Sequence, residues 1–95
     1  MEKKEAYQEK MEAQLKEWNA KIEELRARAR QAAAEAKIQY QEQIETLRTK
    51  YDVAQAKLRE LRTAGEGAWE DLTAGIENAW NELKNAWDTA VSKFK

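Results

Sequence analysis

The sequence predicts an all-α protein, and three observations lead to this prediction. The chain of 95 residues contains no proline and three glycines. Alanine, glutamate, lysine and leucine, which have high helix propensity, are abundant in it. Apolar residues recur at steps of three and four along two long segments, as they do on one face of a helix. We therefore expect one domain over residues 1–95, organised as a helical hairpin with coiled-coil packing.

The longer of the two expected helices covers about residues 2–63. No glycine or proline occurs in this segment. A loop is conceivable only within residues 30–37, but the alanines there are among the strongest helix formers. We expect one continuous helix, roughly 90 Å long at the standard helical rise.

A turn is expected at residues 64–67, which hold two of the three glycines. Gly65 suits the left-handed conformation that often closes a helix, and Gly67 can cap the helix that follows. The break therefore separates the long helix from a shorter one over about 68–94.

The shorter helix carries eleven-residue repeats, with Ala-Trp-Glu-Asp-Leu at 68–72 and Ala-Trp-Asn-Glu-Leu at 79–83. Its large apolar side chains fall on one broad face, which we expect to pack against the long helix. Gly75 lies at the edge of this face. We expect it to mark a close approach of two helices, because an interior glycine otherwise costs about 1 kcal/mol. The packing residues are Trp69, Leu72, Ile76, Trp80, Leu83, Trp87 and Phe94.

The apolar stripe of the long helix reads almost the same from either end. Large side chains lie toward its ends, and alanines occupy its centre. Such a stripe is suited to antiparallel pairing with a second copy of itself. The predicted self-association residues are Met11, Leu15, Trp18, Ile22, Leu25, Ala29, Ala32, Ala33, Ala36, Tyr40, Ile44 and Leu47.

The lengths of the two helices favour a homodimer. The shorter helix can cover only about residues 36–62 of the longer one. Leaving the remaining large apolar side chains in water forfeits on the order of 10 kcal/mol, which is comparable with the stability of a small domain. In the expected antiparallel dimer, Trp18 faces Leu47 and each shorter helix packs on both chains. Two three-helix bundles then lie end to end, about a two-fold axis near Ala32 and Ala33.

Other arrangements also cover the stripe. A parallel pair or a tetramer does so, and a break of the long helix near the alanines gives a monomeric three-helix bundle. A further alternative is partial disorder, with folding that depends on concentration or on a partner, because each isolated helix is marginal.

The composition argues against enzyme activity and against nucleic-acid binding. The chain has no histidine and no cysteine, the commonest general base and the best nucleophile. We therefore expect no enzyme activity, catalytic residue, metal, cofactor or small-molecule substrate. The net charge is −1. Arg26, Arg28 and Arg30 form a local basic cluster, but Arg28 points away from the other two on a helix, so we expect no nucleic-acid partner.

Membrane contact is the alternative to self-association. No apolar run is long enough to span a bilayer, and the first residues lack the apolar core of a signal peptide, so we expect a cytoplasmic protein. The tryptophans of residues 68–94 are compatible with a peripheral membrane or lipid-surface helix. The polar face of this helix is acidic, however, whereas interfacial helices are usually basic, and we prefer packing in a bundle.

Two stretches of the chain resemble a known group of proteins. They are Glu-Ala-Gln-Leu-Lys-Glu-Trp-Asn-Ala-Lys-Ile-Glu-Glu-Leu at 12–25 and Ala-Trp-Glu-Asp-Leu-Thr-Ala-Gly-Ile-Glu-Asn-Ala-Trp-Asn-Glu-Leu at 68–83. The chain is similar to small bacterial coiled-coil proteins that are described as uncharacterised or stress-response proteins. The resemblance implies a helical, cytoplasmic, stress-associated protein without catalytic residues. We expect a non-enzymatic structural or stress-related interaction module that self-associates through its long helix.

Overall fold

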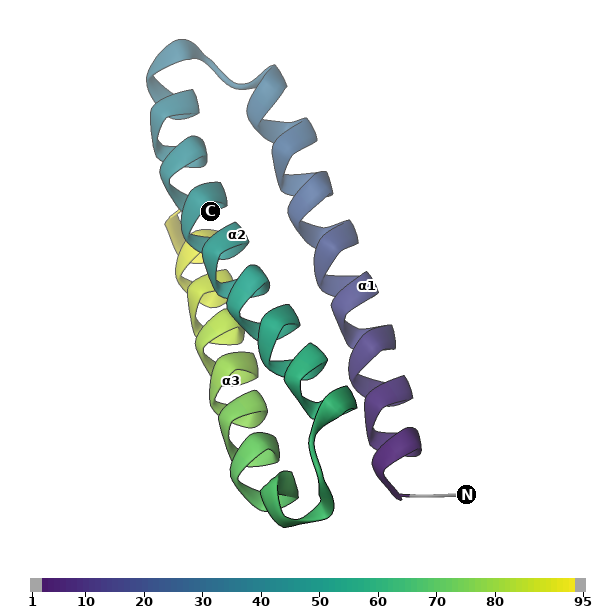
Figure 1. The fold of residues 1–95 in the computed structure, drawn as a ribbon. Coiled ribbons are helices and arrows are strands. Elements are labelled where there is room, and N and C mark those ends of the chain that lie inside the picture. The colour runs from purple at the N-terminus through teal and green to yellow at the C-terminus, as the bar shows by residue number, and fades with distance from the viewer. Residues whose placement is uncertain (1–2, 94–95) are drawn as a thin grey trace.

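The computed structural model describes residues 3–93 and contains three long helices, of which the middle one runs antiparallel to the other two (Figure 1). They are α1 (Lys3–Gln31), α2 (Ala34–Thr63) and α3 (Trp69–Lys93). A short 3₁₀ helix, η1 (Glu66–Ala68), precedes α3. The prediction of an all-helical protein is confirmed, and no strand occurs within the described range.

The prediction of one continuous helix over residues 2–63 is wrong. The segment is divided into α1 and α2 at Ala32 and Ala33, and α2 folds back along α1 (Figure 1). Ala33 has φ −64° and ψ 156°, an extended conformation. The described chain therefore measures 50 × 20 × 19 Å, in place of a rod of roughly 90 Å. This arrangement is the three-helix alternative, with the break near the alanines.

Tertiary packing explains a break in a segment with such high helix propensity. Dividing the helix leaves about four backbone N–H groups without helical acceptors, at about 0.5–1.5 kcal/mol for each lost hydrogen bond. Folding back buries Met11, Leu15, Ile22 and Leu25 within one chain. At about 1.5–3 kcal/mol for each large apolar side chain, this burial exceeds the loss at the break.

The core follows the length of the bundle as two clusters. The first lies toward the α2–α3 connection, and its buried members are Met11, Leu15, Ala54, Leu58, Leu61, Ile76 and Ala79. The second lies toward the Ala32–Ala33 break, and its buried members are Ile22, Leu25, Ala29, Ile44, Leu47, Leu83 and Ala90. Each cluster draws residues from all three helices, so α1 contributes to the whole core.

Helix α2 is the central element of the bundle. It packs against α1 and against α3, whereas no Cα atom of α1 lies within 8 Å of one in α3 over the described residues. Figure 1 shows α1 and α3 flanking α2. Long side chains must therefore span the distance between α1 and α3.

The α2–α3 connection lies where the glycines predicted it, but Gly65 does not have the predicted conformation. Ala64 ends α2 in an extended conformation, with its N–H donating to the Leu61 carbonyl at 3.3 Å. The N–H of Ala68 donates to the carbonyl of Gly65 at 3.1 Å. No glycine in the described segment has a positive φ, so the predicted left-handed Gly65 is wrong.

Gly75 does not mark a close approach of helices, and this prediction is also wrong. A Cβ atom added at Gly75 would lie 3.7 Å from the Nζ atom of Lys57. This is an ordinary van der Waals distance to the end of a flexible side chain. The position therefore has room for alanine.

Candidate self-association surface

The predicted self-association residues lie along the contact of α1 with α2. Seven of them are buried within the single chain: Met11, Leu15, Ile22, Leu25, Ala29, Ile44 and Leu47. Four others are partly buried, namely Trp18, Ala32, Ala36 and Tyr40, and Ala33 is exposed. The stripe that was expected to need a second copy is thus covered by the chain's own α2 and α3. The candidate surface is the apolar face that joins α1 to the α2–α3 hairpin.

The predicted packing face of α3 contributes to the same core. Ile76 and Leu83 are fully buried. Trp69, Leu72, Trp80 and Trp87 are partly buried and pack at the edges of the two clusters. Phe94, the last predicted member, lies outside the described residues.

Aromatic side chains bridge α1 and α3. The rings of Tyr7 and Trp69 meet edge to face, with centroids 5.4 Å apart. Those of Trp18 and Trp87 meet in the same way at 6.0 Å. These two ring pairs and a hydrogen bond between Trp80 and Gln14 form what we call the aromatic seam. In that bond, the indole N–H of Trp80 donates to Oε1 of Gln14 at 2.6 Å.

A lysine covers one end of the aromatic seam. The Nζ atom of Lys21 lies 4.7 Å from the ring centroid of Trp18 and 5.8 Å from that of Trp87. A cation over an aromatic face contributes about 0.5–1 kcal/mol at an exposed site. The α1–α3 contact thus consists of side chains, namely the aromatic seam, one cation and the apolar residues of the two clusters.

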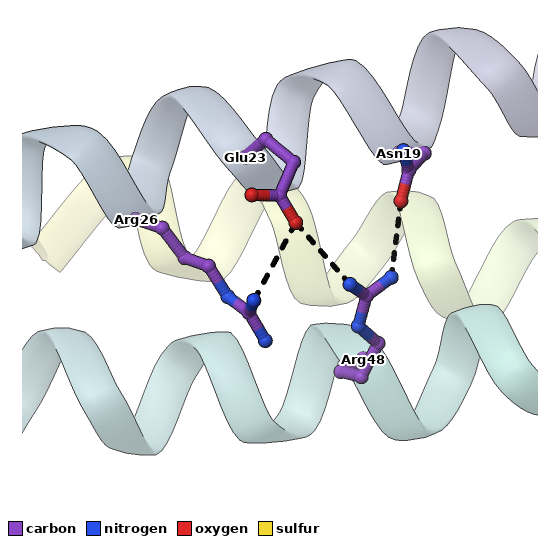
Figure 2. Close-up of polar contacts among 4 residues, drawn as sticks. All are labelled: Asn19, Glu23, Arg26 and Arg48. Carbon is purple, nitrogen blue, oxygen red and sulfur yellow. Dashed lines mark hydrogen bonds and ion pairs between the residues drawn. The ribbon is translucent and has the colours of Figure 1, made fainter.

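Arg48 of α2 forms the main polar contact with α1 (Figure 2). Its Nη1 atom donates to Oδ1 of Asn19 at 3.1 Å, and its Nη2 atom lies 3.3 Å from Oε1 of Glu23. The same carboxylate oxygen lies 3.5 Å from Nη1 of Arg26. The guanidinium also lies 5.4 Å from the ring centroid of Tyr51. These contacts lie at the partly exposed edge of the α1–α2 packing and add to it.

The contacts of Arg48 within one chain can be compared with the register expected between two chains. The register predicted for paired long helices places Leu47 opposite Trp18. Arg48 instead lies between Asn19 and Glu23 in the structure. Within one chain, Arg48 thus contacts residues of α1 that follow Trp18.

Two further contacts attach the start of α1 to the end of α2. Nζ of Lys4 donates to the carbonyl of Ala64 at 2.8 Å. Arg62 forms an ion pair with Glu12. Exposed ion pairs of this kind contribute about 0–1 kcal/mol. The apolar core therefore supplies most of the attraction between α1 and the α2–α3 hairpin.

The connection between α1 and α2 contains only Ala32 and Ala33. Ala33 is the N-cap residue of α2 and makes no side-chain capping hydrogen bond. The N–H of Ala32 donates to the Ala29 carbonyl at 3.2 Å, and that of Lys37 to the Ala33 carbonyl at 2.9 Å. Arg28 and Arg30 in the last turn of α1 complement the helix dipole there. The connection lacks the residues that usually favour a turn.

Tyr7 carries an unpaired polar group at the other end of α1. Its hydroxyl oxygen is buried and has no hydrogen-bond partner. Burial raises the pKa of the phenol above its ordinary value, and the negative charge of Glu77 raises this pKa further. Nε2 of Gln8, on the same turn, is also buried and unpaired. The first turns of α1 are therefore bound to the bundle less favourably than its apolar middle.

The structure brings two members of the predicted basic cluster together. Arg26 and Arg30 line an open depression with Lys37 and Glu45, beside the α1–α2 connection. Arg28 points elsewhere and forms an ion pair with Glu24 at 3.4 Å. No group of three potential metal-ligating side chains occurs among residues 3–93. No helix in that range is long and apolar enough to cross a bilayer.

Comparisons with known proteins return no match. No family model, no curated protein and no solved structure matches the chain. The resemblance to small bacterial coiled-coil proteins therefore stays a prediction.

Proposed function

We propose that the chain is a non-enzymatic structural module that self-associates into a homodimer through the apolar face joining α1 to the α2–α3 hairpin. One observation carries this proposal: α1 lies on α2 and α3 as an amphipathic helical ligand lies in a groove. Its anchors are Met11, Leu15, Ile22 and Leu25, which are buried against the other two helices.

The chemistry of this face supports recognition of another helix. Within the described part of the chain, no polar or charged residue is buried. A face whose fully buried residues are all apolar fits a helix with the same spacing of apolar residues. The α1 helix of a second copy has this spacing by definition, so a second copy is the partner that fits best.

The experiment that tests self-association is a mass measurement over a wide concentration range. Sedimentation equilibrium from low micromolar to millimolar protein is expected to show a monomer that converts to a dimer. Leu25→Asp places a carboxylate in the buried face and should abolish the dimer. Ile38→Asp is the matched control, because Ile38 is 61% exposed. A chain that stays monomeric over the whole range would contradict the proposal.

A second candidate is binding to a lipid surface through α3. The observation in its favour is that Trp69, Trp80 and Trp87 are only partly buried in the bundle. The acidic side chains Glu70, Asp71, Glu77, Glu82 and Asp88 are exposed on the same helix, which opposes contact with anionic lipids.

Vesicles distinguish the two functions. With zwitterionic and with anionic vesicles, we expect unchanged tryptophan emission and no co-flotation. A blue shift with either composition would favour the lipid-surface function. The stress-related role implied by the resemblance stays a prediction.

A further inference from the structure

We propose that two copies dimerise by exchanging α1. Ala32 and Ala33 become helical, α1 and α2 fuse into one long helix, and α1 of each chain packs on the α2–α3 hairpin of the other. This inference rests on the proposed self-association and specifies its partner, its interface and its moving part.

The connection at Ala32 and Ala33 is suited to straightening. Both residues belong to the type with the highest helix propensity. Ala33 already has a helical φ of −64°, so its ψ of 156° is the angle that has to change there. A helix requires ψ near −42°. No glycine, proline or capping side chain at these two positions opposes the change.

A helical connection would also provide hydrogen-bond acceptors for backbone N–H groups that lack them in the monomer. The first N–H groups of α2 have no helical acceptor, because the helix begins at Ala34. In a continuous helix the N–H groups of residues 34–36 donate to the carbonyls of residues 30–32. The hydrogen bond from Lys37 to Ala33 exists already and is kept. The open form therefore gains hydrogen bonds at the connection.

Exchange keeps the contacts of the closed chain. In each half of the exchanged dimer, Ile22 and Leu25 of one copy meet Ile44, Leu47 and Leu83 of the other, as they meet within one chain now. The aromatic seam and the contacts of Arg48 are kept in the same way. The two forms thus differ at the connection and in the entropy of association, so protein concentration sets their ratio.

The exchanged element is α1, and α3 stays with its own α2. The α2–α3 connection contains Gly65 and Gly67 and ends in the 3₁₀ helix η1, and glycine disfavours a helix through this region. The backbone of α3 packs directly against α2, and Lys50 of α2 forms an ion pair with Glu82 of α3. Helix α1 is the element joined by a connection that can become helical.

A crosslinking experiment distinguishes exchange from side-by-side pairing. The chain has no cysteine, so Asn19→Cys with Arg48→Cys introduces a unique pair across the α1–α2 contact. The reagent is a bismaleimide of about 10 Å, the separation of packed helix axes. In the dimer fraction, exchange predicts crosslinks between chains and therefore a covalent dimer on a denaturing gel.

The matched control is Lys50→Cys with Glu82→Cys, across the α2–α3 contact. This pair should crosslink within one chain in monomer and dimer alike. A dimer whose Asn19→Cys/Arg48→Cys pair crosslinks only within one chain would overturn exchange and leave self-association intact. Absence of a dimer at any concentration would overturn both proposals.

A substitution at the connection provides a second measurement that does not disturb the core. Ala33→Asp supplies an N-cap for α2 at a residue with suitable extended angles, and it opposes a helix through this position. We expect the dimer dissociation constant to rise at least ~10-fold, since two connections change per dimer. Ala27→Asp, an exposed position within α1, is the control. Equal effects of the two substitutions would contradict the role of the connection.

Discussion

The two connections of this bundle differ in how the sequence determines them. Residues 64–68 hold Gly65 and Gly67 and a 3₁₀ helix, and Glu70 and Asp71 follow in the first turn of α3. These local features favour a turn and a new helix start. The α1–α2 connection consists of two alanines, with Glu35 in the first turn of α2, but it contains no glycine and no 3₁₀ helix. The α2–α3 turn is thus determined by the local sequence, and the α1–α2 turn by packing between distant residues.

Weakening the packing at Ile22 is expected to have the largest effect on stability, because packing between distant residues determines the α1–α2 connection. Ile22 is fully buried in the cluster nearest that connection. Ile22→Ala is expected to reduce the free energy of unfolding by about 2–5 kcal/mol. Urea denaturation followed by circular dichroism measures it. Ile38→Ala, an exposed position just beyond the same turn, should change stability by less than about 0.5 kcal/mol. Similar losses at both positions would contradict this account of the break.

Removing the unpaired hydroxyl at Tyr7 is expected to stabilise the far end of α1. Tyr7→Phe deletes a buried hydroxyl without a partner and keeps the ring contact with Trp69. We expect a gain of about 1 kcal/mol in the free energy of unfolding, at the lower end of the desolvation cost of such a group. Thermal denaturation at neutral pH measures this gain, and a loss of stability would reveal a hydrogen bond of the hydroxyl.

The same residue predicts a pH dependence. The pKa of Tyr7 is raised in the folded chain, mainly by burial. The phenol stays protonated in the folded state while it ionises in the unfolded state above about pH 10. Stability should therefore fall as the pH rises from about 10 through the raised pKa. This fall should be smaller in Tyr7→Phe, and identical alkaline profiles of the two proteins would contradict the raised pKa.

Gly75→Ala tests whether the third glycine has a structural role. The position lies inside α3, and a Cβ atom there meets the Lys57 side chain at ordinary distances. Alanine should raise the free energy of unfolding by about 0.5–1 kcal/mol through helix propensity. Chemical denaturation measures the gain. A destabilised variant would indicate that two helices do approach closely at Gly75, as the sequence alone predicted.

Gly65→Ala is expected to have the smallest effect and tests whether the α2–α3 connection needs glycine. Gly65 has no positive φ, and nothing lies within 4 Å of a Cβ atom placed there. Alanine should therefore be tolerated, with a gain of up to about 0.4–1 kcal/mol from reduced freedom of the unfolded chain. Thermal denaturation gives the value. A marked loss would indicate that this turn needs glycine for its conformation.

Local sequence features predicted a large part of this fold. The all-α class, the α2–α3 connection and the apolar face of α3 follow from composition, from two glycines and from the eleven-residue repeat. The break at Ala32 and Ala33 could not be predicted in this way, because local propensity favours a helix there. The mirror symmetry of the apolar stripe indicated that its two halves pair, but it suits pairing within a chain and between chains equally.

The polar contacts of the candidate surface were also missed. Asn19, Glu23 and Arg48 each follow a stripe residue directly in the sequence, namely Trp18, Ile22 and Leu47. Helices often form ion pairs at positions that flank an apolar stripe, so the sequence could have indicated these residues. Their pairing required the register of α2 on α1, and a shift of one helical turn changes every partner.

The backbone ¹³C chemical shifts of Ala32 and Ala33, recorded in dilute and in concentrated protein, report whether the connection is extended in the monomer and helical in the dimer. We expect extended values for Ala33 in the dilute monomer, matching its ψ of 156°, and helical values for both residues in the concentrated dimer. Helical values at every concentration would contradict the break within one chain. Extended values of Ala33 in monomer and dimer alike would contradict the exchange of α1.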